Sequence, residues 1–211
     1  MPGLLYARIR DKYREQKQLP MAQLSEEIRR EDPSMKWLPL MQFLSPDFVI
    51  QLGARVVSLV TRPNAYPGWF AIFSELEWML SRLREAAFVG EGERVGVRYI
   101  DYFSEDLFQK LILGLHVGGQ ALTGVEADVT TVFRQQGLTL RLRLANGAIV
   151  TRPDGPQRGS VLDVDVWFGA LDLDLFNNGM ERFTQAHLAA KELFFGLLRP
   201  EYLATLNPVY P

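Results

Sequence analysis

Strict alternation of apolar and polar residues occurs in two segments of this sequence. From residue 138 to residue 144 every second residue is a leucine, and one threonine and two arginines lie between the leucines. From Leu162 to Phe168 apolar residues again alternate with others, which are Asp163, Asp165 and Trp167. Because successive side chains of a strand point to opposite faces, both segments predict half-buried strands in which the two aspartates face solvent.

Further strands are expected on either side of these segments. Asn146-Gly147 is the preferred dipeptide for a two-residue hairpin turn, and it predicts a hairpin whose second strand runs from Ala148 to Thr151. Three short apolar runs separated by turn residues predict an antiparallel meander: 37–43, 47–52 and 56–61.

The segment from Arg94 to Tyr102 predicts another strand with two different faces. One face has Val95, Val97, Tyr99 and Asp101, and the other has Arg94, Gly96, Arg98 and Ile100. An arginine within such an apolar strand requires a carboxylate or a ligand as its partner.

Two long helices are expected. From Gly68 to Ala87 large apolar residues recur at spacings of three and four, and Glu75 and Glu77 are expected to face away from the core. The second begins at Asn177 or Asn178 and ends at Pro200. Shorter helices are expected in three segments: 4–17, 105–116 after a Ser104 cap, and 21–33, where an ordered loop is the alternative.

This order of elements predicts an α+β fold. We expect a twisted antiparallel sheet with helices on one face, within a single domain that spans residues 1–211. Each half of the chain runs from several strands into a long helix. The sequence therefore also suggests two related βα halves, at about 1–120 and 121–211.

Composition excludes several classes of protein. The chain has no cysteine, which rules out disulfides, thiolate metal sites and cysteine nucleophiles. Its formal net charge is −2 and its 23 basic residues are spread along the chain, so nucleic acid is an unfavoured partner. No apolar run approaches the ~20 residues of a membrane span, and we expect a cytoplasmic protein that has no membrane partner.

Four aspartates near the end of the chain raise the question of a metal site: Asp163, Asp165, Asp172 and Asp174. The alternation around the first two is typical of a strand, and no glycine-centred calcium loop is present. The two histidines, His116 and His187, lie far apart in the sequence. We expect His187 to be a hydrogen-bonded core residue and His116 to close its helix, so no metal site is predicted.

Motifs for catalysis or cofactor binding are also missing. The glycine clusters at 90–92 and 114–119 match neither the phosphate-loop pattern nor the dinucleotide-binding pattern. No serine lies in a nucleophile elbow. The sequence therefore predicts no catalytic residue and no cofactor.

One group of residues is a candidate for ligand or partner binding: Arg98, Tyr99 and Asp101. Arg98 could bind an anionic ligand in bidentate fashion, with Tyr99 or Asp101 serving another role. The alternative is a structural ion pair between Arg98 and an acidic residue of a neighbouring element, such as Glu75 or Glu77.

The same segment carries a family resemblance. The chain resembles a sporadically distributed family of bacterial and archaeal conserved hypothetical proteins in four features. These are the run Tyr66-Pro67-Gly68-Trp69, the strand from Arg94 to Asp101, the Asp-rich strand from Leu162 to Phe168, and the late helix that contains His187. Members commonly have asparagine at the position of Asp101, and they usually begin with a strand before the first helix. We expect that strand to be absent here or to precede Met1.

This resemblance implies the fold but no activity. The patchy distribution of the family resembles that of genes that move with mobile or defence loci. Our first hypothesis is therefore a non-enzymatic protein-interaction protein, such as an antitoxin-like or defence-associated accessory, with a protein partner or a second copy of itself. The alternative is a binding protein or enzyme for a small anionic ligand at Arg98. Nucleic-acid binding through Arg141 and Arg143 is the weakest hypothesis.

Overall fold

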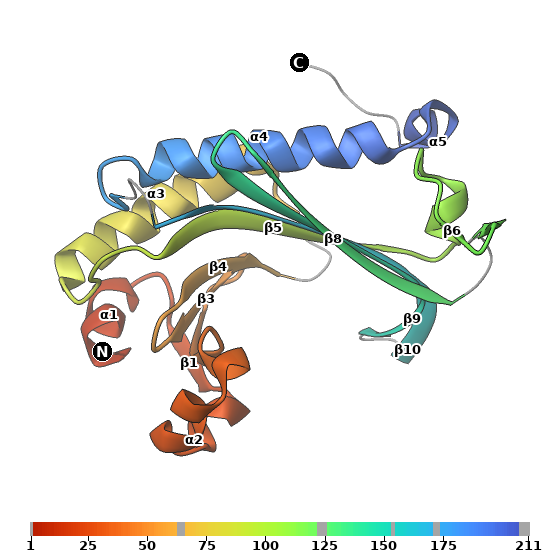
Figure 1. Ribbon diagram of the computed structural model, residues 1–211. Coiled ribbons are helices and arrows are strands. Elements are labelled where there is room, and N and C mark those ends of the chain that lie inside the picture. Colours follow the sequence, from red (N-terminus) through yellow and green to blue (C-terminus); the bar gives the residue numbers. More distant parts are fainter. Residues whose placement is uncertain (1, 63–65, 122–125, 153–154, 171–173, 207–211) are drawn as a thin grey trace. The chain divides into compact units, whose positions relative to one another are not determined.

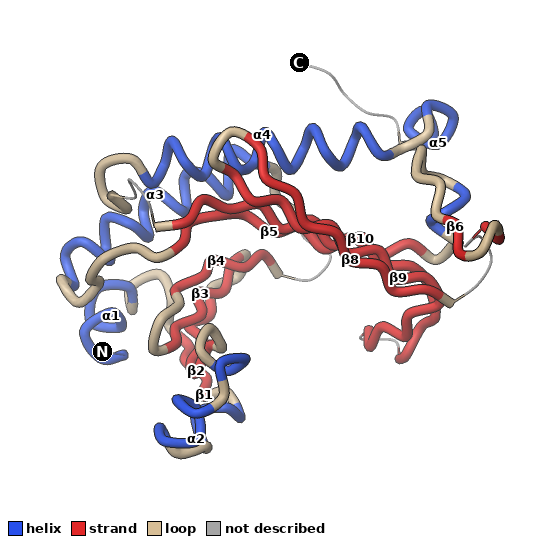
Figure 2. The backbone as a smooth tube through the Cα atoms, in the orientation of Figure 1, coloured by secondary structure: helices blue, strands red, loops and turns tan. Residues whose placement is uncertain are grey.

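The computed structural model describes residues 2–62, 66–121, 126–152, 155–170 and 174–206, which lie in two compact units (Figure 1). Unit 1 spans Met1–Gly90 and unit 2 spans Glu91–Pro211. Each unit has its own four-stranded antiparallel sheet and one long helix (Figure 2). The predicted α+β class is confirmed, but the strands form separate sheets and do not share one. The half-boundary expected near residue 120 falls inside unit 2.

Unit 1 contains an antiparallel meander, as the three apolar runs predicted. Its sheet has the order β1-β2-β3-β4, and each strand pairs with the next. The elements of this unit are α1 (Pro2–Ile9), β1 (Glu15–Gln18), η1 (Pro20–Gln23), α2 (Glu26–Glu31), η2 (Pro33–Met35), β2 (Pro39–Leu44), β3 (Phe48–Gly53), β4 (Val57–Thr61) and α3 (Trp69–Ala86).

The first helix is shorter than predicted. α1 ends at Ile9, a turn follows, and the last three residues of the predicted helix lie in β1, which pairs with the end of β2. Leu5, Ile9 and Tyr13 follow one another at a spacing of four residues, and all three are fully buried, although Tyr13 lies beyond the helix. Backbone pairing with β2 satisfies the N–H and C=O groups that the helix would otherwise have used.

The helix α3 confirms the prediction to within one residue at each end. The expectation that Glu75 faces away from the core is wrong, because Glu75 is only 4% exposed. Its Oε1 accepts a hydrogen bond of 2.7 Å from the Tyr13 hydroxyl, and its Oε2 forms an ion pair with Lys12. These two donors compensate for the burial of the carboxylate.

Unit 2 is built on a sheet of order β5-β10-β9-β8, in which all neighbours are antiparallel. The long helix α4 packs across β5 and β10 on one face of this sheet (Figure 2). The elements of this unit are β5 (Arg94–Phe103), η3 (Leu107–Gln109), β6 (His116–Val117), β7 (Gln120–Ala121), β8 (Ala127–Gln135), β9 (Leu138–Arg152), β10 (Gly155–Gly169), α4 (Gly179–Leu197) and α5 (Pro200–Thr205).

The core of unit 2 confirms the alternation patterns. The inward-facing residues of both alternating segments are at most 7% exposed, and they pack with Ala186 and Ala190 of α4. The second long helix is also confirmed, since Asn178 is its N-cap residue and it ends before Pro200. No helix in the described part of the chain is long and apolar enough to cross a membrane.

The predicted hairpin turn at Asn146-Gly147 is wrong, because β9 continues through both residues to Arg152. The pairing of β9 with β10 shifts at this point: Asn146 lies opposite Ser160 and Ala148 lies opposite Gly159. Gly147, with φ of +74°, is the extra residue of a β-bulge. A glycine with positive φ is compatible with a bulge as well as with a turn. Pairing with the long strand β10 selects the bulge here.

The helix predicted at 105–116 is also wrong. This segment contains only the short helix η3, capped by Asp106 instead of Ser104, and His116 lies in β6. Leu107, Phe108 and Leu111 are buried in the core of unit 2. Leu111 also forms an isolated β-bridge with Leu198. Contacts with the end of α4 therefore override the local helical preference.

Candidate functional site

The strand β5 separates the three candidate residues between two faces of the sheet. Tyr99 belongs to the face that α4 covers, and Asp101 has the same parity. Arg98 lies on the opposite face, which we call the outer face. The structure therefore does not bring Arg98, Tyr99 and Asp101 together as one site.

Arg98 forms an ion pair with Asp163 of β10. Its Nε and Nη2 donate hydrogen bonds of 2.8 and 2.6 Å to the two carboxylate oxygens. These bonds raise the pKa of Arg98 above its usual value, although burial acts in the opposite direction. Arg98 therefore forms a structural ion pair with an acidic residue of a neighbouring element, as the alternative expected. The carboxylate is that of Asp163 and not that of Glu75 or Glu77.

The expectation that Asp163 and Asp165 face solvent is wrong. Both lie on the outer face, yet each is only 3% exposed because arginine side chains pair with it. Asp165 pairs with Arg94 from β5 and with Arg141 from β9. The Arg141 Nη2 lies 3.2 Å from Asp165 Oδ2. Asp165 is therefore bound by cations from both neighbouring strands, and Asp163 is bound by a cation from β5.

A glycine in β5 makes room for a tryptophan on the same face. Gly96 lies opposite Trp167, and an added Cβ would lie 2.5 Å from the Trp167 Cβ and 2.3 Å from the Val166 carbonyl oxygen. The Arg94 guanidinium stacks on the Trp167 ring at 4.1 Å from its centroid. Gly96 thus allows Arg94 to pass over the tryptophan and reach Asp165.

A fourth arginine of this surface pairs with β8, at the far side of the sheet. Arg143 of β9 donates through Nε and Nη2 to Asp128 of β8, with a shortest distance of 2.6 Å. These hydrogen bonds lower the pKa of Asp128. We call Arg94, Arg98, Arg141 and Arg143 the arginine face. Four guanidinium groups and three carboxylates leave this group with one net positive charge.

On the helix side, Tyr99 meets His187 of α4. The Tyr99 hydroxyl lies 2.8 Å from His187 Nδ1, and the two rings are tilted with centroids 5.9 Å apart. Burial lowers the pKa of His187, and the charge of Lys191 lowers it further. His187 is hydrogen-bonded as expected, but it is half-buried and lies outside the core.

Asp101 lies two residues beyond Tyr99 on β5. Burial raises the pKa of its carboxyl group, and no charged or hydrogen-bonding neighbour in the described part of the chain contributes to that shift. Asp101 is therefore a partly buried carboxylate whose ionised form is disfavoured in the fold.

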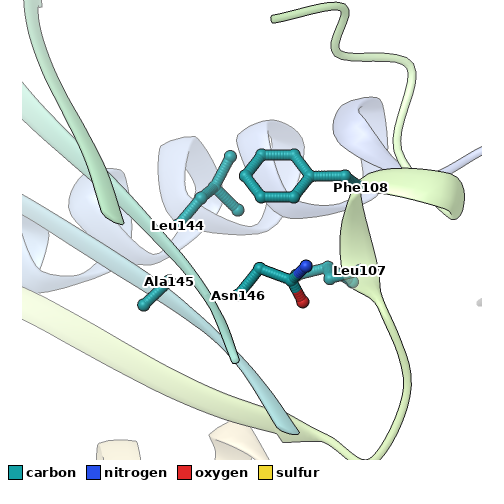
Figure 3. A pocket seen from close by; sticks show the side chains of 5 residues that line it. All are labelled: Leu107, Phe108, Leu144, Ala145 and Asn146. Atoms are coloured by element: carbon teal, nitrogen blue, oxygen red, sulfur yellow. The ribbon is translucent and has the colours of Figure 1, made fainter. Parts of the chain in front are cut away.

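Two hollows of unit 2 lie away from the arginine face. Figure 3 shows the first, in which Leu107 and Phe108 pack over Leu144, Ala145 and Asn146 and leave no space for a water molecule. The second, of about 380 Å³, is lined by residues 112–114 and 199–201. Arg98 lines neither hollow.

Asp174 does not form a metal site with Asp163 and Asp165. Asp174 caps the turn before α4, since its Oδ1 accepts hydrogen bonds of 3.2 Å from the backbone N–H of Phe176 and of Asn177. Asp172 lies outside the described residues. In the described ranges, no three His, Asp or Glu side chains are grouped to hold a metal ion.

The sequence indicated three arginines of this surface, Arg98, Arg141 and Arg143, but not their partners. The alternation of each strand places Arg141 and Arg143 on the face away from the leucines, and Asp163 and Asp165 on the face away from the core residues of β10. Only the register between β9 and β10 brings these residues together. Arg94 and Trp167 carried no signal of their own. Gly96 within an otherwise apolar strand is the one sequence feature that indicates a close approach.

No protein-family model, curated protein or solved structure matches this chain. The family resemblance drawn from the sequence stays a prediction.

Proposed function

We propose that this chain is a non-enzymatic protein-interaction protein whose arginine face binds an acidic segment of a partner protein. The observation that carries the proposal is the group of four guanidinium groups, 37–48% exposed, on the outer face of unit 2. A guanidinium has five N–H donors, and the ion pairs above engage one or two of them. The others are available to carboxylates of a partner.

The residue types on this surface also support a protein partner. Arginine and tryptophan are enriched at protein interfaces and lysine is depleted, and none of the four strands of this sheet contains a lysine. Two aliphatic side chains of the same face are exposed, Ile100 at 61% and Val132 at 51%. Such residues can bury apolar area between the charged contacts.

A small anionic molecule is the second candidate ligand, and the geometry favours it less. Asp163 already occupies the Nε–Nη2 side of the Arg98 guanidinium, which leaves only the Nη1–Nη2 side for bidentate binding of a carboxylate or phosphate ligand. Nucleic acid is favoured less than either, because carboxylates pair with all four arginines of the arginine face and leave little positive charge for counterion release. An antitoxin-like or defence-associated role stays a prediction.

Fluorescence anisotropy with labelled probes tests the proposal. The probes are a peptide of alternating glutamate and leucine, the same peptide with glutamine in place of glutamate, and single- and double-stranded DNA of mixed sequence. We expect the acidic peptide alone to bind at physiological salt. Arg143→Gln should weaken this binding by up to about fivefold, through loss of one exposed charge contact.

Arg158→Gln is the matched control, because Arg158 also forms an exposed ion pair in unit 2, with Glu126, but is not part of the arginine face. It should leave peptide binding unchanged. Equal losses in both variants, failure of the acidic peptide to bind, or tighter binding of DNA with steep salt dependence would each overturn the proposal.

A further inference from the structure

The strand β8 leaves one edge of the second sheet open. It pairs with β9 along all nine of its residues, and no described strand pairs with its other edge. Its sequence, ADVTTVFRQ, is rich in β-branched and aromatic residues and has no proline or lysine. Edge strands without such protecting residues are templates for pairing with another strand.

The turn that follows β8 fixes which backbone groups face the open edge. Gln135 pairs with Leu138 across a two-residue loop, and Gln136 and Gly137 have φ of +52° and +79°, as a type I′ turn requires. The pair that flanks such a loop is hydrogen-bonded, and bonded and non-bonded pairs alternate along the ladder. The even-numbered residues therefore direct their N–H and C=O groups to the open edge: Asp128, Thr130, Val132 and Arg134.

We propose that β8 pairs with β8 of a second copy of this chain, antiparallel and centred on Thr131. In this register Asp128 lies opposite Arg134 of the second copy, and Thr130 lies opposite Val132. Both are pairs of residues whose backbone groups face the open edge, so the ladder bonds can form. On the other face, Val129 lies opposite Phe133 and Thr131 meets its own copy.

Charge complementarity selects this register among the alternatives. The two-fold symmetry creates two Asp128–Arg134 pairs, each with opposite charges directly across the ladder. A shift of two residues places Asp128 opposite Val132 or beyond the end of the strand. A shift of one residue opposes backbone groups that point in different directions. Asp128 is 51% exposed and held by Arg143, so its carboxylate is already positioned on the outer face.

The dimer would extend the arginine face. A two-fold axis perpendicular to the sheet keeps the outer faces of both copies on the same side. The result is a continuous sheet of eight strands with two arginine faces, which can bind two acidic segments of one partner with increased avidity.

Sedimentation velocity and a cysteine cross-link test the dimer. The chain should sediment at twice its mass of 24.0 kDa. Arg134→Glu should raise the dissociation constant at least about tenfold, because each Asp128 then faces a carboxylate. Arg158→Glu, a charge reversal in another exposed ion pair, should leave it unchanged.

Since the chain has no cysteine, a single introduced thiol reports the register. Thr131→Cys should form a disulfide-linked dimer in a glutathione redox buffer, whereas Val129→Cys should not, because the two copies of residue 129 lie four residues apart along the ladder. A monomer at every concentration, or equal cross-linking of both variants, overturns the proposal. A monomer that still binds the acidic peptide would overturn the dimer and leave the proposed function in place.

Discussion

Trp167 of β10 lies directly across the ladder from Gly96 of β5, where the absence of a side chain leaves room for the indole. The indole in turn supports the Arg94 guanidinium, which pairs with the buried Asp165. A single glycine therefore determines how one end of the arginine face is assembled.

We expect Gly96→Ala to destabilise unit 2 by about 1–3 kcal/mol, the usual cost of overpacking. The added Cβ would contact backbone atoms of β10, which cannot move without disturbing the ladder. Gly169→Ala is the control, because nothing lies within 4 Å of a Cβ at that position. Urea denaturation measures both, and equal stability of the two variants would refute the steric argument.

The Arg98–Asp163 pair is expected to be coupled more strongly than an exposed pair. Asp163→Ala should cost about 1–3 kcal/mol, since Arg98 loses its carboxylate but remains 48% exposed. The double variant Arg98→Met with Asp163→Leu should recover most of this cost, because neither charge is then left without its partner.

A double-mutant cycle measures this coupling, with Arg158–Glu126 as the exposed reference pair. We expect the reference pair to contribute less than about 1 kcal/mol. A coupling energy for Arg98 and Asp163 no greater than that of the reference would contradict the prediction.

The two long helices and the faces of β5 could be predicted from the sequence, because their periodicity arises within one segment. The partners of Arg98 could not, since Arg98 and Asp163 are separated by 65 residues and meet only through the register of β5 and β10. The sequence around Gly147 predicts a turn and not a bulge for a similar reason. The conformation of Gly147 depends on whether a long partner strand is present.

The stability of unit 2 should fall as the pH decreases below 6.5, through His187. Its pKa is lowered in the fold, first by burial and then by Lys191, so the unfolded chain binds a proton more readily. The contribution of the neutral imidazole is fully present above pH 6.5 and is lost as the pH falls through the native pKa.

NMR titration of the His187 ring checks this directly, with His116→Gln as the background that leaves one histidine to observe. Lys191→Gln should raise the pKa of His187, because it removes a like charge. A pKa of His187 at or above 6.5 in the native protein would refute the prediction.

The contribution of Asp101 to stability should depend on pH in the opposite sense from that of an ion-paired acid. Burial raises its pKa in the fold, so the native state binds a proton more readily than the unfolded chain does. The stability that the protonated carboxyl group contributes is fully present below pH 3.8, the usual pKa of an aspartate, and it is lost as the pH rises through the native pKa. Asp101→Asn should therefore be more stable than the wild type at neutral pH and equally stable at low pH.

Asp128→Asn gives the reverse result in the same assay, which makes it the matched control. Hydrogen bonds from Arg143 lower the pKa of Asp128, so its ionised form stabilises the fold above pH 3.8 and this contribution is lost as the pH falls through the native pKa. Denaturation midpoints of both variants and the wild type, measured from acid to neutral pH, should thus diverge in opposite directions as the pH rises. If Asp101→Asn instead lost stability at neutral pH, its carboxylate would have a stabilising partner in solution.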